Sequence, residues 1–427
     1  MNPPILVLIL AGARSDRLHA LGRLRTASAL PYGGKYRVID FALSNCVHSG
    51  LYQIGVLTQY APLSLHGHIG IGRPWDLDRR DGGVRLLPAY ARQRGTTWYR
   101  GTADALVQNR NVIADAQARH IVVMTGDLVA KIDLGPLLER HEQRGAALTI
   151  VTAPQPPGAG EWRRPVVSGS DGRVSAIPDV GAEPGTPVSA NVWLFRAREL
   201  RARLESPDVG ADLVRDVVEP MIARGLPVYA QPYDGYWRQI VSIDAYYAAS
   251  MELLAPYPAL NLHDPDWLIY TPSEDRAPAI VTGGGDASGS LVAHGCRIEG
   301  TVRRSILFPG VHVAPDARVE DSIVMHDTRV LAKARVARAI VDKSVRIGEG
   351  AVVGGDGGPP NRDYPEDLAS GLAVVGKRAE IPAGGRVGAN SLIDIGARES
   401  DFPRELPPGA TVRARAPRAP ASSRAPA

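Results

Sequence analysis

A 17-residue repeat in the last third of the chain restricts the possible fold more than any other feature of the sequence. Apolar residues recur at steps of six, five and six, so that each position returns 17 residues later. The recurring positions form three series: Cys296, Val313, Val330 and Ile347; Val302, Val319, Val336 and Val353; and Leu307, Val324 and Val341. An amphipathic α-helix needs apolar spacings of three and four, which are absent here. Three short strands per turn, each with one inward side chain, are typical of a triangular parallel β-helix.

The repeat also marks the limits of this second domain. A loop rich in glycine and proline, GGDGGPPNRDYPEDLASG, interrupts it at residues 354–371. The six-residue step then resumes at Val375, Ile381, Val387 and Ile393. We therefore expect a β-helix over residues 286–400, preceded by a linker at 256–285 that is rich in Pro, Gly and Asp.

The end of the chain differs in composition from the rest. Residues 407–427 contain four arginines and no acidic residue, and the formal net charge of the 427-residue chain is +4. The remainder is therefore formally neutral, which argues against a nucleic-acid-binding protein. Residues 401–427 have no periodic apolar face, so we expect a disordered basic tail there.

The first 255 residues show the alternation of strands and helices that is typical of an α/β domain. Apolar strands are predicted at 5–10, 54–60, 120–127, 147–153, 192–195 and 227–233, and helices at 40–49, 102–118 and 208–224. Such alternation implies a largely parallel sheet that is covered on both faces. Ligands of such sheets bind outside the carboxyl ends of the strands.

Three features fall at such strand ends and carry the chemistry of a nucleotide site. A loop with Gly12 follows the first strand, where its N–H groups and Arg17 can meet phosphates. Asp127 ends another strand and can hold a hard cation. In WYRGTADAL (98–106), Thr102 is expected to cap a helix behind Gly101. Each feature also has a structural explanation, as a turn, a strand end or a capped helix.

Localisation follows from the cysteines and the apolar runs. Cys46 and Cys296 lie far apart in apolar surroundings, which predicts two buried thiols and a reducing cytoplasm. The run ILVLILAG at residues 5–12 is too short to cross a bilayer, so no membrane association is expected.

Taken together, these segments resemble the bacterial glucose-1-phosphate adenylyltransferases (ADP-glucose pyrophosphorylases). The matching motifs are GGKYRVIDFALSNCVHSGL (33–51), VLTQY (56–60), WYRGTADAL (98–106), TGDL (125–128), YWRQI (236–240) and SLVAHGCRIEGTVRRSILF (290–308). The resemblance implies a Rossmann-like nucleotidyltransferase domain, a left-handed parallel β-helix and a homotetramer. It also implies a magnesium-dependent reaction of ATP with glucose 1-phosphate, which yields ADP-glucose for glycogen synthesis and pyrophosphate.

The resemblance further assigns roles to individual residues. It implies catalytic roles for Arg17 and Asp127, and substrate binding by Gly12, Tyr99, Gly101, Thr102 and Ser189. In the family two carboxylates hold the magnesium ion; here Asp127 supplies one, and Gln239 stands where the second is expected. A glutamine offers only a neutral carbonyl oxygen to a divalent cation.

Other ligand positions depart from the family pattern as well. Residues 13–16 replace a glycine-rich phosphate loop and bring in Asp16, and Ala27 stands in place of a lysine. Residues 178–181 lack the Lys–Glu pair that grips the sugar phosphate, and Asn191 replaces a glycine. We expect an adenylyltransferase relative with weakened or lost catalysis, a pseudoenzyme that regulates or senses ligands, alone or with a catalytic relative.

Three other interpretations stay open at this point. The chain could be an active adenylyltransferase with rebuilt contacts, or a nucleotidyltransferase for another sugar phosphate. The last is an acyltransferase that uses a β-helix histidine, for which the candidates are His294, His312 and His326.

Overall fold

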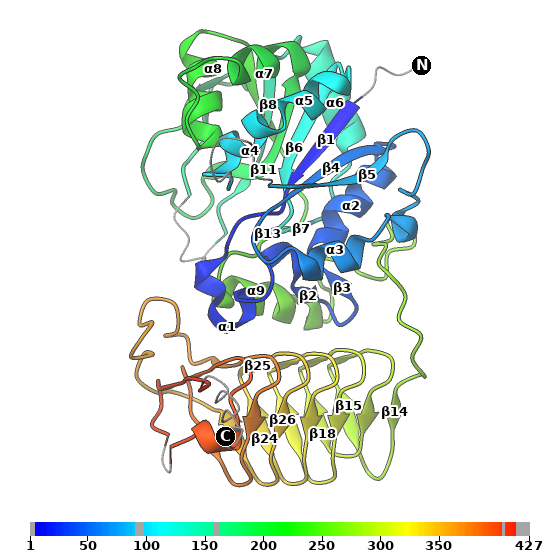
Figure 1. The fold of residues 1–427 in the computed structure, drawn as a ribbon, viewed down its shortest axis with the longest axis vertical. Helices are drawn as coiled ribbons and strands as arrows, with labels where there is room; N and C mark the ends of the chain where they lie inside the picture. Colours follow the sequence, from blue (N-terminus) through cyan, green and yellow to red (C-terminus); the bar gives the residue numbers. More distant parts are fainter. Residues whose placement is uncertain (1–4, 90–97, 157–162, 404–405, 416–427) are drawn as a thin grey trace, which may run out of the picture. The chain divides into compact units, whose positions relative to one another are not determined.

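A computed structural model describes residues 5–89, 98–156, 163–403 and 406–415. The chain divides into two compact units (Figure 1). The first consists of Met1–Tyr32 and Tyr36–Glu274, and the second of Gly33–Lys35 and Asp275–Ala427.

A seven-stranded sheet forms the centre of the first unit. Its strand order is β12 (Val228–Pro232), β8 (Leu148–Pro154), β11 (Pro187–Arg196), β6 (His120–Thr125), β1 (Ile5–Leu10), β4 (Gln53–Thr58) and β5 (Gly83–Pro88). All neighbours pair in parallel except β11, which runs antiparallel to both β6 and β8. The largely parallel sheet expected from the sequence is therefore confirmed, although β5 was not among the expected strands.

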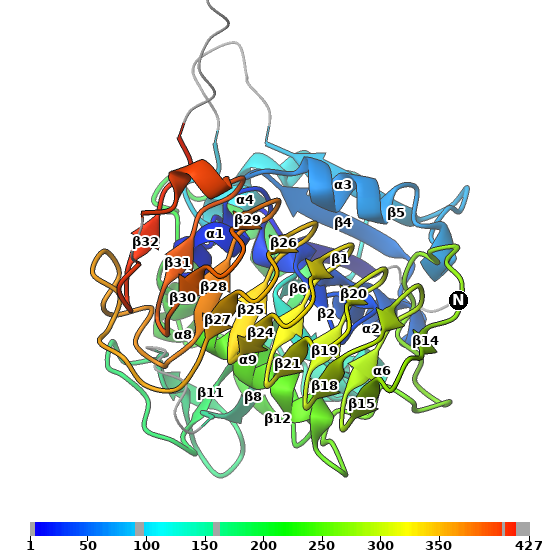
Figure 2. The ribbon, with the colours of Figure 1, turned by 90° about the horizontal axis from the view of Figure 1, so that it is seen from below.

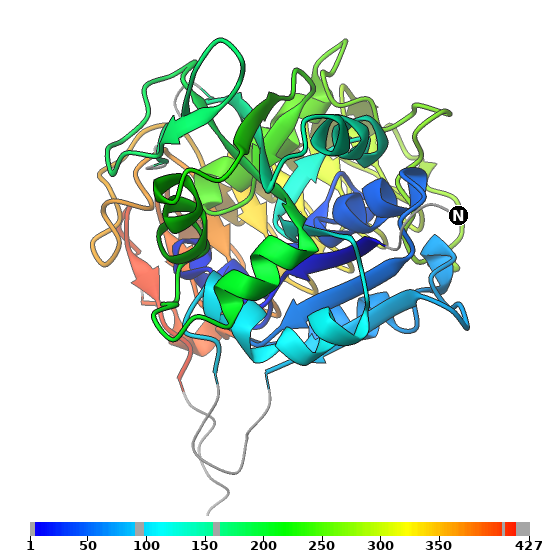
Figure 3. The ribbon, with the colours of Figure 1, turned by 90° about the horizontal axis from the view of Figure 1, so that it is seen from above.

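Helices cover both faces of this sheet. The helices are α1 (His19–Gly22), α2 (Ile39–His48), α3 (Leu63–Ile69), α4 (Thr102–Gln108), α5 (Arg110–Asp115), α6 (Leu134–Gln143), α7 (Ala197–Leu204), α8 (Glu219–Ala223) and α9 (Ile243–Met251). Short helical turns lie at η1 (Asp16–Leu18), η2 (Ala27–Ala29), η3 (Arg73–Trp75), η4 (Val214–Val218) and η5 (Glu252–Leu254). Figure 3 shows the blue α2 and teal α6 on one side of the sheet and the cyan α4 and α5 on the other.

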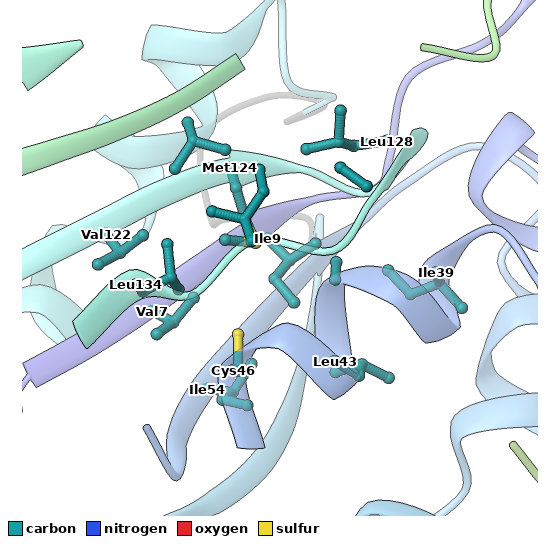
Figure 4. Packing of buried hydrophobic residues seen from close by; sticks show 14 of the residues in the cluster. Val7, Ile9, Ile39, Leu43, Cys46, Ile54, Val122, Met124, Leu128 and Leu134 are labelled. Carbon is teal, nitrogen blue, oxygen red and sulfur yellow. The ribbon is translucent and has the colours of Figure 1, made fainter. Parts of the chain in front are cut away.

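The apolar runs of the central strands explain this double cover. In β1, Val7 and Ile9 face the cluster that includes α2 and α6, whereas Leu6 and Leu8 face the cluster of α4, α5 and α7. Successive side chains of a strand point to opposite faces, so a strand buried on both sides is apolar throughout. Figure 4 shows the first cluster, in which side chains of α2 pack against β1, β4 and β6.

Two expected helices are interrupted. The predicted helix at 102–118 is divided into α4 and α5 at Asn109. The predicted helix at 208–224 begins as the π-helical turn η4 and continues as α8, with Pro220 in its first turn. Proline has no N–H to donate to the carbonyl four residues earlier. That carbonyl, of Asp216, instead accepts a hydrogen bond from Arg203 Nε at 2.9 Å.

Three two-stranded ribbons complete the first unit. They pair β2 (Pro31–Tyr32) with β3 (Tyr36–Arg37), β7 (Leu128–Ala130) with β13 (Trp237–Gln239), and β9 (Val167–Ser168) with β10 (Val174–Ala176). The β7–β13 ribbon extends directly from Asp127, and it brings residues more than 100 positions apart in the sequence into one pair.

The second unit is the expected β-helix of three parallel sheets. The first sheet contains β14 (Ile280–Val281), β17 (Arg297–Ile298), β20 (His312–Val313), β23 (Arg329–Val330), β26 (Arg346–Ile347) and β29 (Glu380–Ile381). The second contains β15 (Asp286–Ser288), β18 (Thr301–Arg303), β21 (Arg318–Glu320), β24 (Arg335–Ala337), β27 (Val352–Gly354) and β30 (Arg386–Val387). The third contains β16 (Leu291–Val292), β19 (Ile306–Leu307), β22 (Ile323–Val324), β25 (Ala339–Val341), β28 (Ala373–Val375), β31 (Leu392–Ile393) and β32 (Thr411–Val412).

The expected register is confirmed for most of the repeat. Val313 pairs with Val330, and Val330 with Ile347, in the successive rungs that Figure 2 shows side by side. Past the inserted loop the series continues, because Ile347 pairs with Ile381. Parallel in-register strands place like side chains above one another, so each series becomes a buried apolar column.

Cys296 is a correction to this register. The partner of Val313 is Ile298, and the turn between these two residues is two residues shorter than the turns before and after it. The buried thiol of Cys296 instead donates to the carbonyl of Phe308 at 3.2 Å. Cys46 is also buried, and both thiols are free, as expected.

The boundaries of the β-helix also differ from those expected. Strand β14 lies inside the expected linker, and the earlier part of that linker packs on the first unit, where Trp267 stacks on His48 at 4.6 Å. At the other end, η6 (Glu399–Asp401) crosses the expected boundary, β32 lies in the expected disordered tail, and Val412 is 3% exposed. Val412 pairs with Ile393 and covers the open edge of the third sheet, a local gain that composition does not reveal. The rest of the expected tail, 416–427, lies outside the described residues.

Candidate functional site

The loop after β1 and the residue after β6 meet at the carboxyl edge of the sheet. Gly126 N–H donates to the Leu10 carbonyl at 2.9 Å. A Cβ on Gly126 would lie 3.1 Å from the Cβ of Ala11, so these two chain segments touch. Because β1 and β6 are adjacent and parallel, their ends bring the Gly12 loop and Asp127 together, as the sequence predicts.

Gly12 has a packing role at this edge. A Cβ at Gly12 would lie 2.9 Å from the backbone nitrogen of Gln59, and the Gly12 carbonyl accepts from Tyr60 N–H at 3.2 Å. A side chain here would push the loop off the end of β4. Gly12 thus allows a close backbone approach, whether or not phosphates also bind.

The altered part of the loop, residues 13–16, is arranged around its own charges. Asp16 forms an ion pair with Arg14 at 2.5 Å, and the Arg14 guanidinium lies 5.6 Å from the centre of the Tyr60 ring. The carboxylate that the sequence places beside a phosphate site is therefore paired within the loop, although both groups are exposed and the pair adds little stability. Arg17 lies on η1, directly after this loop, and is half-buried.

Asp127 and Gln239 form the centre of the candidate site. Gln239 is the last residue of β13, opposite Leu128 of β7, and its Nε2 donates to Asp127 Oδ2 at 3.1 Å. The backbone fixes the pair further, since Ile240 N–H donates to the Asp127 carbonyl at 2.9 Å. The other carboxylate oxygen, Asp127 Oδ1, is buried and has no hydrogen-bond partner among the described residues.

This burial changes the acidity of Asp127. Loss of hydration raises the pKa of the Asp127 carboxyl, while the neighbouring Thr125 hydroxyl, the Gln239 hydrogen bond and the charge of Arg163 oppose the rise. A buried carboxylate oxygen without a partner is a costly arrangement that a bound cation would relieve.

The fit to magnesium can be judged from these donors. The described residues contain no group of three or more His, Cys, Asp and Glu that could hold a metal ion by themselves. Magnesium often takes only one or two carboxylates from the protein and its other ligands from phosphates and water. Asp127 Oδ1 fits that pattern as the one anionic ligand, whereas Gln239 turns its amide nitrogen to the other carboxylate oxygen.

Tyr99 is held both through its phenol and through its backbone, which bonds to Gln59, the residue directly after β4. The Gln59 side chain accepts from Tyr99 N–H, and its Nε2 donates to the Tyr99 carbonyl at 3.2 Å. The phenol donates to the Leu87 carbonyl at 3.2 Å and accepts from Asn109 Nδ2 at 3.0 Å. The hydroxyl of Tyr99 therefore has structural partners, and the aromatic face remains its contribution to a nucleotide site.

The expectation that Thr102 caps the helix is wrong. Thr102 is the first residue of α4, and its Oγ1 accepts from Leu213 N–H at 2.9 Å. The free N–H of Arg100 is instead satisfied by Asp104 Oδ2 at 2.9 Å. The glycine at position 101 is required by the same packing, because a Cβ there would lie 2.4 Å from the Ala211 carbonyl oxygen. Both residues thus lock α4 to the segment at 211–213.

Ser189 lines a second part of the site, a cavity of about 280 Å³ that also reaches Gln239. Its Oγ accepts from Asn191 N–H at 3.1 Å. Asn191 has φ +59°, the left-handed conformation that a glycine would adopt most readily. Asparagine tolerates this conformation, so the backbone of the family pattern is kept while a polar side chain enters the cavity lining.

Residues 178–181, which differ from the family pattern, are anchored close to this cavity. Arg164 Nε donates to the Pro178 carbonyl at 3.1 Å, and Nη1 contacts Glu219 of α8 at 2.6 Å. Ile177, directly before the segment, lines the cavity. Ala27, which stands in place of a lysine, is 3% exposed on η2.

Two of the three candidate histidines of the β-helix, His312 and His326, have other side-chain partners. His312 Nε2 lies 3.0 Å from Glu299 Oε2, and Glu299 also accepts from Arg297. His326 stacks on Phe308 with a distance of 5.2 Å between the ring centres. These contacts give both rings a place in the coil surface, and nothing in them favours acyl transfer.

The fold and the strand-end site define a class: a Rossmann-like nucleotide-binding domain joined to a hexapeptide-type β-helix. The "Nucleotidyl transferase" family matches residues 6–255, and "GlmU-like, C-terminal hexapeptide" matches residues 280–365. Glucose-1-phosphate adenylyltransferase of Thermomicrobium roseum is 43% identical over 96% of this chain and 97% of its own. That of Acetivibrio thermocellus is 35% identical over 93% and 95%, respectively. The chain belongs to the nucleotidyl transferase family and, within it, to the glucose-1-phosphate adenylyltransferases.

Two other features of the site carry no signal in the sequence motifs. Arg163 lies beside the cavity, but its Arg-Arg dipeptide matches no motif. Gln59 was noted only as part of VLTQY, although its amide pairs with the backbone of Tyr99. In the described residues no helix is long and apolar enough to cross a membrane.

Proposed function

We propose that this chain is a glucose-1-phosphate adenylyltransferase-type protein of ADP-glucose and glycogen synthesis in which Gln239 weakens catalysis. It binds ATP and glucose 1-phosphate and serves chiefly as a ligand-sensing or regulatory subunit, in a homotetramer or together with a catalytic relative. The observation that carries the proposal is the hydrogen bond from Gln239 to Asp127, which puts an amide where the family pattern has a carboxylate.

The reaction itself requires little covalent chemistry from the protein. A phosphate oxygen of glucose 1-phosphate attacks the α-phosphorus of ATP, the bond to the β-phosphate breaks, and pyrophosphate leaves. Magnesium, when bound, neutralises the phosphate charge that develops. The protein positions the two substrates and stabilises charge, so catalysis depends on the charges of a few side chains.

Each of these side chains then has a defined task. Asp127 would hold the cation through Oδ1, and Arg17 would face the phosphates from η1. Gln239 holds Asp127 Oδ2 through its Nε2, and this orients the carboxylate. It adds no negative charge, so one protein charge would hold the cation where the family pattern supplies two.

An active enzyme with rebuilt contacts is the second candidate. It is favoured by the similarity along nearly the full length of relatives that carry this name. The paired charge of Asp16 and the left-handed Asn191 favour it too, because both departures are accommodated locally. A reaction with a related sugar 1-phosphate belongs to the same candidate.

Substitutions at Gln239 distinguish the weakened, regulatory protein from the active enzyme. Gln239→Asp restores the residue of the family pattern. Gln239→Asn is the control, because asparagine has the shape of aspartate without its charge. We expect Gln239→Asp to lower the magnesium concentration needed for half-maximal ATP binding by about tenfold, and Gln239→Asn to leave it unchanged. The measurement is a magnesium titration of ATP binding by calorimetry.

Pyrophosphate release tests catalysis on the same proteins. We expect wild-type turnover with ATP and glucose 1-phosphate to lie on the order of a hundredfold below that of typical enzymes. Gln239→Asp should improve metal affinity more than turnover, because residues 13–16 and 178–181 stay altered. Robust wild-type turnover, unchanged in Gln239→Asp, would show an active enzyme in which Gln239 is no metal ligand.

A further inference from the structure

The short strand that carries Gln239 has contacts on both of its faces. Strand β13 pairs with β7 in a ribbon of two strands. On one face, Trp237 Nε1 donates to a main-chain carbonyl of β11 at 3.1 Å, and Gln239 Nε2 donates to Asp127 Oδ2. Successive side chains alternate between the faces, so Tyr236 and Arg238 lie on the other one. A two-stranded ribbon is marginally stable by itself, and contacts of its side chains must therefore fix its position.

Glu252 binds the two residues on this second face. It is the first residue of η5, directly after α9. Glu252 Oε1 accepts from Arg238 Nε and Nη2 at 3.2 and 2.9 Å, and Oε2 accepts from the Tyr236 hydroxyl at 2.7 Å. Each carboxylate oxygen thus holds one neighbour of Trp237. Hydrogen bonds to an ionised group are stronger than neutral ones and fix geometry, so a single carboxylate holds the far face of the strand.

Further contacts orient the Arg238 and Tyr236 side chains. Arg238 Nη1 donates to the Trp237 carbonyl at 2.8 Å, and its guanidinium carbon lies 4.9 Å from the centre of the Tyr236 ring. Burial and the charge of Glu252 raise the pKa of the Tyr236 phenol, so its hydroxyl stays protonated and continues to donate. The side chains of Arg238 and Glu252 are 32% and 39% exposed. Water screens such a pair, so it adds little to global stability and acts mainly on orientation.

We propose that Glu252 is a positioning residue: it fixes β13 from the face opposite the site and so sets how residue 239 meets Asp127. The backbone couples the two, since Ile240 N–H donates to the Asp127 carbonyl at 2.9 Å. A displaced β13 would therefore move the side chain at position 239 relative to the carboxylate. The proposal rests on the proposed function, because it concerns the metal affinity of the same pair.

A double-mutant cycle with Gln239→Asp tests this role. Calorimetry gives the magnesium concentration for half-maximal ATP binding in wild type, Gln239→Asp, Glu252→Ala and the double variant. We expect Gln239→Asp to lower this concentration about tenfold when Glu252 is present, but about threefold or less in the Glu252→Ala background, because the new carboxylate is no longer held in place. Glu252→Gln keeps a side chain that can bond to Arg238 and Tyr236, and should restore most of the gain.

Glu199→Ala is the matched control. Glu199 Oε1 on α7 also accepts from Nε and Nη2 of one arginine, Arg198, at 3.0 and 2.6 Å. Its loss should leave the gain from Gln239→Asp at about tenfold. Equal gains with and without Glu252 would overturn the positioning role while the proposed function stands. No gain from Gln239→Asp even in the presence of Glu252 would instead count against the proposed function, and the position of β13 is then decided without metal.

Hydrogen exchange of the ligand-free proteins, followed by mass spectrometry, provides that measurement. Glu252→Ala should speed exchange of the amides at 236–241 by about tenfold, because the strand opens more often, whereas Glu199→Ala should not. Faster exchange confined to α9, with 236–241 unchanged, would show that Glu252 only holds the helix end, and would overturn the proposal. Should Glu252→Ala fail to fold, Arg238→Met breaks the same ion pair from the strand and replaces it in both measurements.

Discussion

At the scale of single residues, the site combines a carboxylate that is costly to bury with an amide that holds it. Asp127 Oδ1 has no hydrogen-bond partner among the described residues, and Gln239 satisfies only the other oxygen. Groups arranged for a ligand are often unfavourable in the free protein, because function and stability place different demands on the same position. Asp127 is therefore a residue at which a loss of function should coincide with a gain in stability.

Asp127→Asn tests this directly. Burial raises the pKa of Asp127, so the folded state favours the protonated form, and the ionised form destabilises the fold as the pH rises through that pKa. We expect Asp127→Asn to raise the melting temperature of the ligand-free protein at pH 7 by a few degrees. The gain should vanish below the ordinary pKa of aspartate, where the wild-type carboxyl is protonated in both states. Thermal unfolding at pH 7 and pH 3.5 measures the difference, and an equal or lower melting temperature for the variant at pH 7 would contradict it.

At the scale of elements, each short strand of the β-helix has a stable position only in the stack. Strands such as β20, β23 and β26 have two residues each, one inward and one outward. One rung cannot bury its apolar residue alone, so the neighbours above and below supply the contacts. The column of Val313, Val330 and Ile347, all 0% exposed, is the result.

Val330→Asp should therefore disrupt the second unit, because the column offers a carboxylate neither a hydrogen bond nor an opposite charge. We expect a loss of several kcal/mol and a proteolytic fragment pattern in which residues 290–353 are cleaved. Arg329→Asp, on the outward position of the same strand, is the matched control, since Arg329 is exposed. Comparable stability of both variants in urea unfolding and limited proteolysis would mean that the column does not support the fold.

At the scale of the whole molecule, the proposed function requires assembly. The expected homotetramer has about four times the 45.6 kDa mass of one chain. The first strand of the β-helix, β14, exposes Ile280 at 52% and Val281 at 50%. Exposed apolar side chains on a sheet edge are typical of surfaces that another chain covers.

Light scattering after size-exclusion chromatography tests the assembly. We expect a tetramer for the isolated chain, and a lower association state for Ile280→Lys with Val281→Lys if this edge is part of the contact. A monomer at micromolar concentration would contradict the homotetramer and leave the hetero-oligomer with a catalytic relative as the form to test by co-expression. An unchanged tetramer in the double variant would exclude the edge of β14.

The sequence by itself determined the two-domain architecture and the place of the site. A period of 17 residues with fixed apolar steps sets the register of a β-helix, because every turn must bury the same positions. Apolar runs that end in Gly12 and Asp127 set the ligand edge of the sheet, because parallel strands end together. The tertiary structure decided what each polar group does. Asp127 and Gln239 meet across 112 positions, Thr102 bonds to Leu213, and Arg163 stacks on Trp237. Apolar periodicity is a local signal that repeats, whereas a side-chain hydrogen bond or stacking contact depends on two distant segments brought together by packing, and no local pattern records it.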